Sequence, residues 1–494
     1  MIGTLRINDI EKAPPLSQRV AKNSFAVLGG QVFSLAANLG ATALLARHLG
    51  QVDFGLFSYA IVYVSLFALV ADFGMQTIIV RELNRREWSS VELLGNAVLI
   101  KAALSLAAII LAILVARLTG YSETLFIVIA VLSLNIPITA KLLAFRNAFE
   151  APFHASLQMQ LPMLFQMLDS FLLIGVTFGL IHLDASLEWL VLGYVLSNLP
   201  GLVLFVFVAL RRFQFQFVIN KRIVRFLFKE SLPLWLYTIL TTLFGGADVL
   251  LLKELSGEGA VGLYSAATRL ASPLMFIPNA VVVSLFPLLS RYYEQSDKKL
   301  AMAFHFGMKV ILLVALALAI ATTFYGPAVV HLLYSDTYKA STAPLIILMW
   351  SQAFLFLNFF FASVLTSANQ QRTTFHAAAT MLLANIVANL ILIPALGIRG
   401  TAWAKLFSSI CGFAVLFRAT GKVFVIELPQ LLPRLAALGV AFACGVALLS
   451  RAQFGTSLIV AIWILPLFVL LFRVFNKEER AIFRSLIPKS LFRN

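Results

Sequence analysis

The hydrophobic positions along this chain form long runs, and the polar positions form short charged segments between those runs. Each run is close to the roughly 20 residues that a helix needs to cross the hydrocarbon core of a bilayer. The pattern therefore predicts an all-α integral membrane protein with about 14 transmembrane helices. The expected spans are residues 25–46, 54–74, 94–116, 122–145, 158–181, 188–210, 232–253, 261–286, 306–326, 341–365, 375–396, 399–418, 432–450 and 456–474.

One helical pair occurs twice in the chain. Residues 41–49 return as residues 247–255 at an offset of 206, and residues 55–60 return as residues 262–267 at an offset of 207. In transporters built from such repeats, the substrate path lies between the two halves. Because each half holds six spans, an even number, both halves should enter the membrane in the same sense. We expect a cytoplasmic tail at 1–24, pseudo-symmetric six-helix lobes at 25–220 and 221–422, two C-terminal helices within 423–475 and a cytoplasmic tail at 476–494.

The composition agrees with a membrane protein. The 494 residues are 61% hydrophobic and only 12% charged, whereas a soluble domain is about half apolar and a quarter charged. A net charge of +16 would suggest nucleic acid in a soluble protein, but its distribution has another cause here. If the spans alternate, 30 of the 38 Lys and Arg lie on one side, six lie on the other and two lie inside spans. By the positive-inside rule, both termini are cytoplasmic in a multi-pass protein of the cell inner membrane.

The sequence predicts no metal site, no cofactor and no catalytic group. Cys411 and Cys444 both lie inside apolar runs, so neither a disulfide framework nor a thiolate metal site is expected. The six histidines are scattered without metal-ligand spacing. The outer loops are short and hold no cluster of carboxylates or histidines, which a membrane enzyme would require.

Two cations inside predicted spans are assigned to neither side of the membrane, and an ionisable group there costs about 2.5–3.5 kcal/mol or more and usually faces a cavity or a partner. Arg269 lies about 12 Å deep and Lys405 about 9 Å deep, at 1.5 Å of rise per residue. Arginine suits a phosphate because its planar fork binds two oxygens at once. Both residues are therefore candidates for substrate binding; the alternative for each is a structural pair, for example Arg269 with Asp248.

Four further cations are candidates at span ends. Arg47 and Lys253 are matched residues of the two repeats; they either snorkel to the interface or form a basic entrance. Arg81 and Arg146 lie near the cytoplasmic ends, where topology alone accounts for a cation and capture of an anionic headgroup is the alternative.

The intramembrane acids Asp72, Asp169 and Asp248 are candidates for a coupling-ion site, either for a proton or for a cation. Asp169 is the best of them because it lies nearest the bilayer centre, although buried hydrogen bonding is equally compatible with its position. Asn385 and Asn389 lie one turn apart on one helical face, and we expect them to hold span 11 against a neighbour. The phenylalanine cluster at 354–361 is expected to pack or to face lipid.

Some of these residues also resemble a known family. The segments are Asp72-Phe73-Gly74 and, above all, Asn385 to Asn389, which leads through Ile393-Pro394 to the run from Gly397 to Ala404. They resemble the polysaccharide-transporter branch of the multidrug/oligosaccharidyl-lipid/polysaccharide exporter superfamily, with fourteen spans arranged as six, six and two and a cationic cavity. Thr401 departs mildly from the small residue typical of that position.

The resemblance implies a flippase that carries undecaprenyl-pyrophosphate-linked oligosaccharide repeat units from the inner to the outer leaflet, for lipopolysaccharide or exopolysaccharide. The expected partners are this substrate, membrane lipid, and a polysaccharide polymerase and chain-length regulator. A charged headgroup cannot cross the hydrocarbon unaided, so such a protein needs a polar cavity and no catalysis. The alternatives are a lipid II flippase, a multidrug antiporter and, from a different class, a membrane polysaccharide polymerase or ligase.

Overall fold

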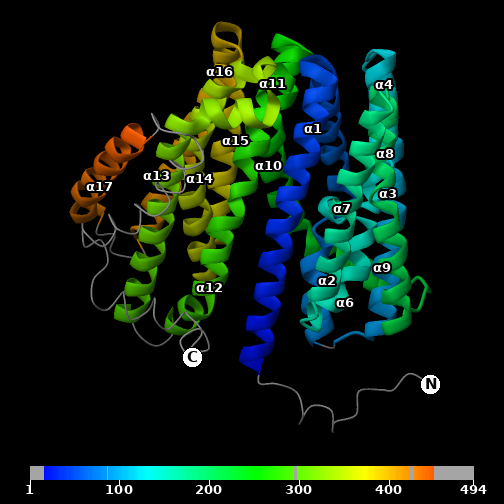
Figure 1. Cartoon of the computed structure of the whole chain (residues 1–494). Helices are drawn as coiled ribbons and strands as arrows, with labels where there is room; N and C mark the ends of the chain where they lie inside the picture. The colour runs from blue at the N-terminus through cyan, green and yellow to red at the C-terminus, as the bar shows by residue number, and fades with distance from the viewer. Residues whose placement is uncertain (1–15, 86, 294–296, 423–427, 450–494) are drawn as a thin grey trace, which may run out of the picture. The chain divides into compact units, whose positions relative to one another are not determined.

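The computed structural model describes residues 16–85, 87–293, 297–422 and 428–449 (Figure 1). Every regular element in these ranges is a helix. Ten segments are long and apolar enough to cross a membrane, which confirms the prediction of an all-α, multi-pass membrane protein.

The ten segments account for eleven of the predicted spans. Spans 1 and 2 lie in one continuous stretch, Gly29–Arg85, in which Gly50 breaks the helical geometry with φ 72°. Two further predicted spans correspond to shorter apolar helices, Glu123–Ile138 and Ala436–Leu449. The predicted span 456–474 lies outside the described residues, so the count of fourteen stays a prediction.

The chain divides into two compact units. Unit 1 consists of Met1–His48 with Ala60–Ile239, and unit 2 consists of Leu49–Tyr59 with Leu240–Asn494. Two continuous helices, α1 (Leu16–Asp72) and α10 (Lys221–Ser256), contribute to both units. The lobe limits expected from the sequence, 25–220 and 221–422, remain a prediction.

Unit 1 is a helical bundle with two apolar cores. Besides its parts of α1 and α10 it contains α2 (Met75–Arg85), α3 (Ser90–Leu118), α4 (Glu123–Ser133), α5 (Asn135–Ile138), α6 (Phe145–Ala155), α7 (Gln160–His182), α8 (Leu187–Leu196) and α9 (Leu199–Arg212). The short amphipathic helices α2 and α6 pack against each other and against α3. One core includes Met75, Leu93 and Leu227, and the other centres on Phe153 and Phe205.

A tight turn separates α1 from α2. Phe73 and Gly74 both have positive φ, 44° and 66°, a backbone conformation that glycine adopts at little cost. A Cβ on Gly74 would also lie 3.0 Å from the backbone nitrogen of Trp235. The Trp235 indole donates a hydrogen bond of 2.7 Å to the carbonyl of Leu69. The Phe73 ring stacks on the same indole. The turn therefore fixes the end of α1 against α10.

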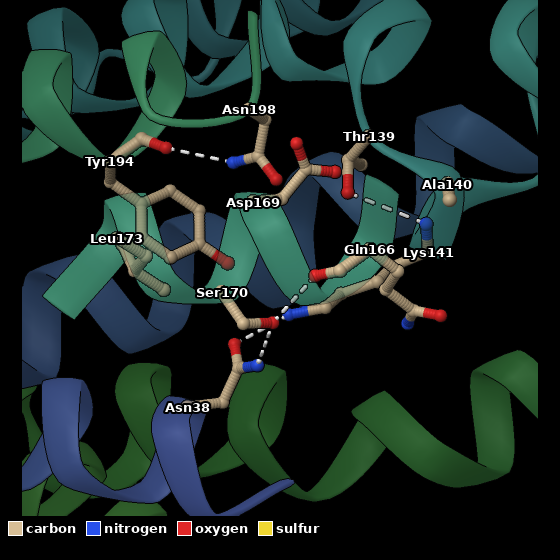
Figure 2. A pocket seen from close by; sticks show the side chains of 10 residues that line it. All are labelled: Asn38, Thr139, Ala140, Lys141, Gln166, Asp169, Ser170, Leu173, Tyr194 and Asn198. Atoms are coloured by element: carbon tan, nitrogen blue, oxygen red, sulfur yellow. Dashed lines mark hydrogen bonds between the residues drawn. The ribbon is translucent and has the colours of Figure 1, made fainter. Parts of the chain in front are cut away.

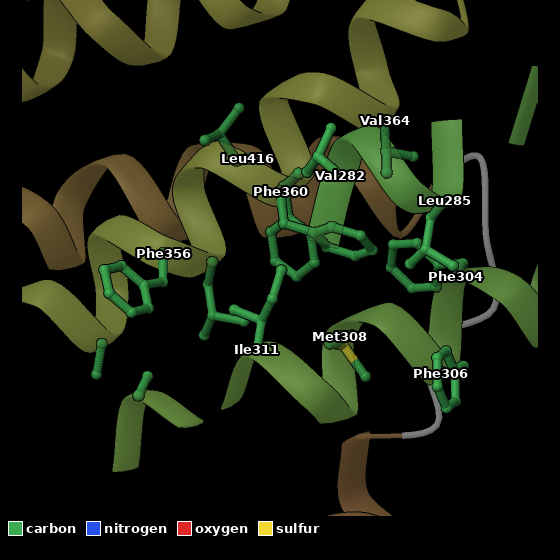
Figure 3. Packing of buried hydrophobic residues seen from close by; sticks show 14 of the residues in the cluster. Val282, Leu285, Phe304, Phe306, Met308, Ile311, Phe356, Phe360, Val364 and Leu416 are labelled. Atoms are coloured by element: carbon green, nitrogen blue, oxygen red, sulfur yellow. The ribbon is translucent and has the colours of Figure 1, made fainter. Parts of the chain in front are cut away.

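Unit 2 is a second helical bundle around a phenylalanine-rich core. It contains residues 49–59 of α1, the second half of α10, α11 (Glu258–Ala271), α12 (Phe276–Tyr293), α13 (Asp297–Tyr334), α14 (Thr342–Ser367), α15 (Gln371–Leu396), α16 (Ile398–Thr420) and α17 (Leu428–Leu449). Phe304 stacks on Phe360 and Phe361 in this core, with Phe356 nearby (Figure 3). These phenylalanines of α14 therefore pack, as expected.

The two copies of the repeat meet inside unit 2. A Cβ on Gly55 would lie 1.9 Å from the carbonyl oxygen of Glu258, and a Cβ on Gly262 would lie 2.0 Å from that of Gln51. The relation is reciprocal, because each added Cβ would also lie within 3.2 Å of the backbone nitrogen of the other glycine. Gly55 and Gly262 are the equivalent positions of the repeat, so the two copies cross backbone to backbone around a local two-fold axis.

Candidate functional site

The charged residues that the sequence places in apolar surroundings form three groups. Two of these groups are buried networks, one in each unit, and the third surrounds Arg269. Each group lies within one unit and is described there.

Arg146 organises the network of unit 1. Its side chain is completely buried on α6, and its guanidinium lies over the Phe205 ring at 5.7 Å. One guanidinium nitrogen, Nη1, donates to Asp169 Oδ2 of α7 at 2.5 Å, and Nε lies 3.5 Å from Glu150 Oε1 one turn further along α6. A buried charge is stable only when it is paired, so this guanidinium ties α6 to α7.

A second buried pair lies in the same unit. Lys101 of α3 is completely buried, and its ammonium lies 3.5 Å from Asp72 Oδ1 at the end of α1. The ammonium also donates a 2.6 Å hydrogen bond to the carbonyl of Leu143, which has left-handed φ (52°). Lys101 therefore neutralises Asp72 and holds the irregular segment between α5 and α6 in place.

Burial shifts the pKa values of two residues of α6, Glu150 and His154. This helix lies outside the ten membrane-spanning segments. Burial raises the pKa of Glu150 to about 7, although the charges of Arg146 and Lys101 act in the opposite direction. Asp169 adds a smaller increase through like-charge repulsion. His154 lies 4.0 Å from Glu150, and burial lowers its pKa, which disfavours the charged imidazolium. Burial therefore brings the pKa of Glu150 close to neutral pH.

A small polar pocket lies beside Asp169 (Figure 2). Its polar lining comes from α1, α7, α8 and the loops that follow α5 and α8. Lys141 donates to Asn38 Oδ1 at 2.6 Å, and the Asn38 amide lies 3.3 Å from Ser170 Oγ. One carboxylate oxygen of Asp169 is buried without a hydrogen-bond partner. Polar lining of this kind suits a water molecule.

Asp248 organises the network of unit 2. It is buried on α10 and is bound by groups from three other helices. The Lys405 ammonium of α16 lies 2.9 Å away, the Tyr264 hydroxyl of α11 donates at 3.0 Å, and the Asn389 amide of α15 donates at 3.0 Å. Lys405 also donates to the carbonyl of Phe244 and lies over its ring. The structure therefore pairs Asp248 with Lys405, and the alternative pairing with Arg269 is wrong.

Arg269 has different surroundings. It lies half-buried on α11 near the repeat crossing, where its guanidinium carbon is 5.4 Å from the Phe54 ring centre and 5.6 Å from that of Phe57. One guanidinium nitrogen, Nη2, lies 3.4 Å from Ser58 Oγ. Stacking on rings uses the face of the guanidinium, whereas oxygen ligands bind its edge. Contact with the two rings and the serine hydroxyl therefore orients this cation.

The remaining candidates lie nearer the surface. Arg81 is partly exposed and binds Glu82 at 2.8 Å and Glu230 at 2.9 Å. Lys253 lies 3.1 Å from Glu254, and its ammonium is 5.3 Å from the Tyr59 ring centre. Arg47 is exposed, although it is the repeat counterpart of Lys253. The two matched cations thus differ in their surroundings.

The structure joins candidates that the sequence left separate. Arg146 and Asp169 form one pair, and Lys405 and Asp248 form another. Asn389 binds Asp248 and Asn385 lies 3.5 Å from Ser408, so the expectation that these asparagines hold α15 to its neighbours is confirmed.

Glu150 and Tyr264 belong to the buried networks but were not singled out from the sequence. Glu150 follows Arg146 by one helical turn within an apolar stretch, and this spacing was an available signal. Tyr264 gave no signal, because only the fold brings its hydroxyl to Asp248.

Comparison with known proteins gives consistent results. A family model described as "Polysaccharide biosynthesis protein" matches residues 20–293, and a second model, MatE, matches residues 233–391. The chain is 21% identical to the probable low-salt glycan biosynthesis flippase Agl15 of Haloferax volcanii over 399 residues, covering 79% of this chain and 81% of that protein. It is also 21% identical to the uncharacterized membrane protein MJ1068 of Methanocaldococcus jannaschii, but that match spans only 44% of either chain.

Two solved structures show the same fold. The inward closed conformation of the lipid II flippase MurJ superposes with a TM-score of 0.76 at 15% identity, covering 95% of this chain and 100% of that one. An inward-facing multidrug resistance MATE family transporter superposes with a TM-score of 0.63 at 14% identity, covering 81% and 98%. This chain therefore has the same fold as these two proteins.

Proposed function

Because this chain belongs to the polysaccharide biosynthesis protein family, we propose that it is a flippase for lipid-linked glycans. In its specific form, the proposal is that it moves undecaprenyl-pyrophosphate-linked oligosaccharide repeat units from the inner to the outer leaflet of the cytoplasmic membrane by alternating access. The observation that carries the proposal is the family match over residues 20–293. The resemblance to Agl15, a probable glycan biosynthesis flippase, over most of both chains supports it.

The prediction that the protein is not an enzyme is confirmed by these comparisons. Relatives of the chain are named as probable flippases, and the proteins that share its fold are transporters. Moving a lipid-linked sugar needs binding and a change of conformation but no bond-breaking group. The work of such a protein is to shield a polar, anionic headgroup whose transfer into hydrocarbon is costly.

The proposal assigns different roles to the charged groups. Arg269 is the candidate contact for the pyrophosphate, supported by its depth and by the rings that orient it. Arg47 and Lys253, the matched cations of the repeat, are proposed to attract the headgroup, and Arg81 to capture it at the cytoplasmic side.

Arg146 and Lys405 fit substrate binding less well, since each is already paired with a buried carboxylate. Their partners Asp169 and Asp248, together with Asp72, stay candidates for coupling. Support for this role comes from their burial and their cationic partners, because a proton or an ion that competes for such a pair changes helix contacts.

The test is a flipping assay in proteoliposomes. Purified protein is reconstituted with undecaprenyl-pyrophosphate-linked oligosaccharide, and exposure of the sugar on the opposite leaflet is measured over time. We expect flipping by the wild type and little flipping by Arg269→Ala, with the exposed Arg117→Ala as the matched control. If the wild type does not accelerate exposure above protein-free liposomes, the substrate assignment is wrong.

Two alternatives compete in the same assay. Lipid II is the substrate suggested by the MurJ fold, and a cationic drug is the one suggested by the MatE match. Either compound, supplied in excess, should slow flipping of the oligosaccharide lipid only if it shares the site. Faster transport of lipid II or of the drug than of the oligosaccharide lipid would transfer the assignment to that alternative.

A further inference from the structure

The buried network of unit 1 is unbalanced in charge. Two buried cations, Lys101 and Arg146, face three buried carboxylates, Asp72, Glu150 and Asp169. Asp72 is paired with Lys101, and Asp169 accepts the short hydrogen bond from Arg146. An excess negative charge in a buried network is costly, and the protein can remove this cost by binding one proton.

The geometry distinguishes the two carboxylates that share Arg146. Glu150 lies 3.5 Å from Arg146 Nε, whereas Asp169 lies 2.5 Å from Nη1 of the same guanidinium. The amide of Asn147 donates to Glu150 at a long 3.3 Å, and the imidazole of His154 is 4.0 Å away. Charge-assisted hydrogen bonds are normally shorter than these contacts.

The helices that pack on α6 bring the other charges. Lys101 of α3 and Asp169 of α7 act on Glu150, the first favouring its ionised form and the second disfavouring it. Lys141 lines the Asp169 pocket, but its side chain is exposed, so solvent weakens its effect. On α2, Arg81 is paired with Glu82 and with Glu230. The other ionisable residues of α2 and α9 lie in the last turns of these helices: Arg85, Arg211 and Arg212.

We propose that Glu150 is a proton-binding site, and that its proton decides how Arg146 is shared between α6 and α7. With Glu150 protonated, Arg146 serves Asp169 alone and the α6–α7 contact is at its strongest. With Glu150 ionised, two carboxylates compete for one guanidinium and this contact weakens. The pKa of Glu150, which burial raises to about 7, agrees with this geometry. The proposal concerns proton binding and does not depend on the identity of the transported lipid.

Infrared spectroscopy of the full-length protein in lipid nanodiscs tests the proposal. A protonated carboxylic acid has a carbonyl band that ionised carboxylates lack, and we expect such a band to lose its intensity over about two pH units centred near pH 7. The band should disappear in Glu150→Gln and persist in the exposed control Glu123→Gln. In Asp169→Asn, where Glu150 no longer competes for Arg146, it should titrate at lower pH. Carbon-13 labelling of glutamate carboxyls in the wild type should shift the band, and labelling of aspartate carboxyls should not.

The carbon-13 labelling experiment uses the wild-type protein, so the test stays valid even if Glu150→Gln fails to fold. A band that shifts with labelled aspartate, or that persists in a folded Glu150→Gln, assigns the proton to another residue and overturns the proposal. Absence of any titrating band between about pH 5 and about pH 9 also overturns it, because the charge of Glu150 would then not change in this range. In the supporting case, Glu150→Gln should also flatten the fall of thermal stability that the wild type shows between about pH 5 and about pH 7.

Discussion

At the scale of single residues, the structure separates the buried cations by what surrounds them. Lys405 and Arg146 each lie against a buried carboxylate, whereas Arg269 lies against two phenylalanine rings and a serine hydroxyl. A charge that closes a network inside one unit stabilises that unit. Substitutions of Arg269 and Lys405 should therefore fail in different ways.

The first prediction concerns Arg269. Replacement by alanine should abolish polysaccharide export while membrane abundance stays near that of the wild type, because the residue closes neither buried network. Arg269→Lys should restore only part of the export, since lysine keeps the charge but loses the planar fork. Export is measured in a strain that lacks the chromosomal copy, and abundance by immunoblot. Normal export by Arg269→Ala would remove this residue from the substrate site.

The second prediction concerns Lys405. Replacement by alanine leaves Asp248 charged and buried, and breaking a buried pair in this way costs about 3–5 kcal/mol. We expect a clear drop in the unfolding temperature in detergent, and partial recovery when Asp248→Asn is added. Exposed Lys422 is the matched control, and Lys422→Ala should leave the unfolding temperature unchanged. Equal stability of Lys405→Ala and the wild type would show that the pair is not structural.

At the scale of elements, the repeat is a packing device as well as a sequence similarity. Gly55 and Gly262 occupy equivalent positions and allow two helix backbones to touch, which a side chain at either position would prevent. Small residues have this use at helix crossings in membranes. Both contacts lie inside unit 2, so the crossing joins residues 49–59 to that unit.

The third prediction tests this crossing. Gly55→Ala and Gly262→Ala each place a methyl group about 2 Å from a backbone carbonyl oxygen, and overpacking of this kind costs about 1–3 kcal/mol or more. Gly245 lies in helix α10 with open space around it, so Gly245→Ala should instead stabilise by about 0.5–1 kcal/mol. Thermal unfolding of the three variants makes the comparison. Similar behaviour of all three would contradict a close crossing.

At the scale of the whole molecule, the distribution of Lys and Arg is the main evidence for topology. Thirty of these residues fall on one side of the predicted spans and six on the other. A missed or additional helix would mix the two sets, so the asymmetry supports an even number of spans with both termini in the cytoplasm.

The fourth prediction follows from this asymmetry. Reporter tags inserted at residue 12 and after residue 480 should report a cytoplasmic location, and a tag in the connection 182–186 should report the opposite side. The connection between α7 and α8 is described by the structure, whereas the two terminal positions lie outside the described residues. Labelling of either terminus from outside the cell would refute the topology.

The sequence alone determined that the chain is a multi-pass helical membrane protein with a repeated helical pair. Both properties are local or periodic, because the length of an apolar run and the recurrence of a motif need no knowledge of contacts. It also indicated which intramembrane charges needed a cavity or a partner, namely Arg269, Lys405 and the three aspartates.

Only the tertiary structure decided which partners these charges have. Asn389 and Asp248 are 141 positions apart, and Lys405 and Phe244 are 161 apart, yet they form one network. The energy of a buried charge depends on groups within a few ångströms, and helix packing brings these together from distant parts of the chain. The same packing places Glu150 near Arg146 and Asp169. This environment, which the sequence does not show, is the reason that we propose Glu150 as a proton site.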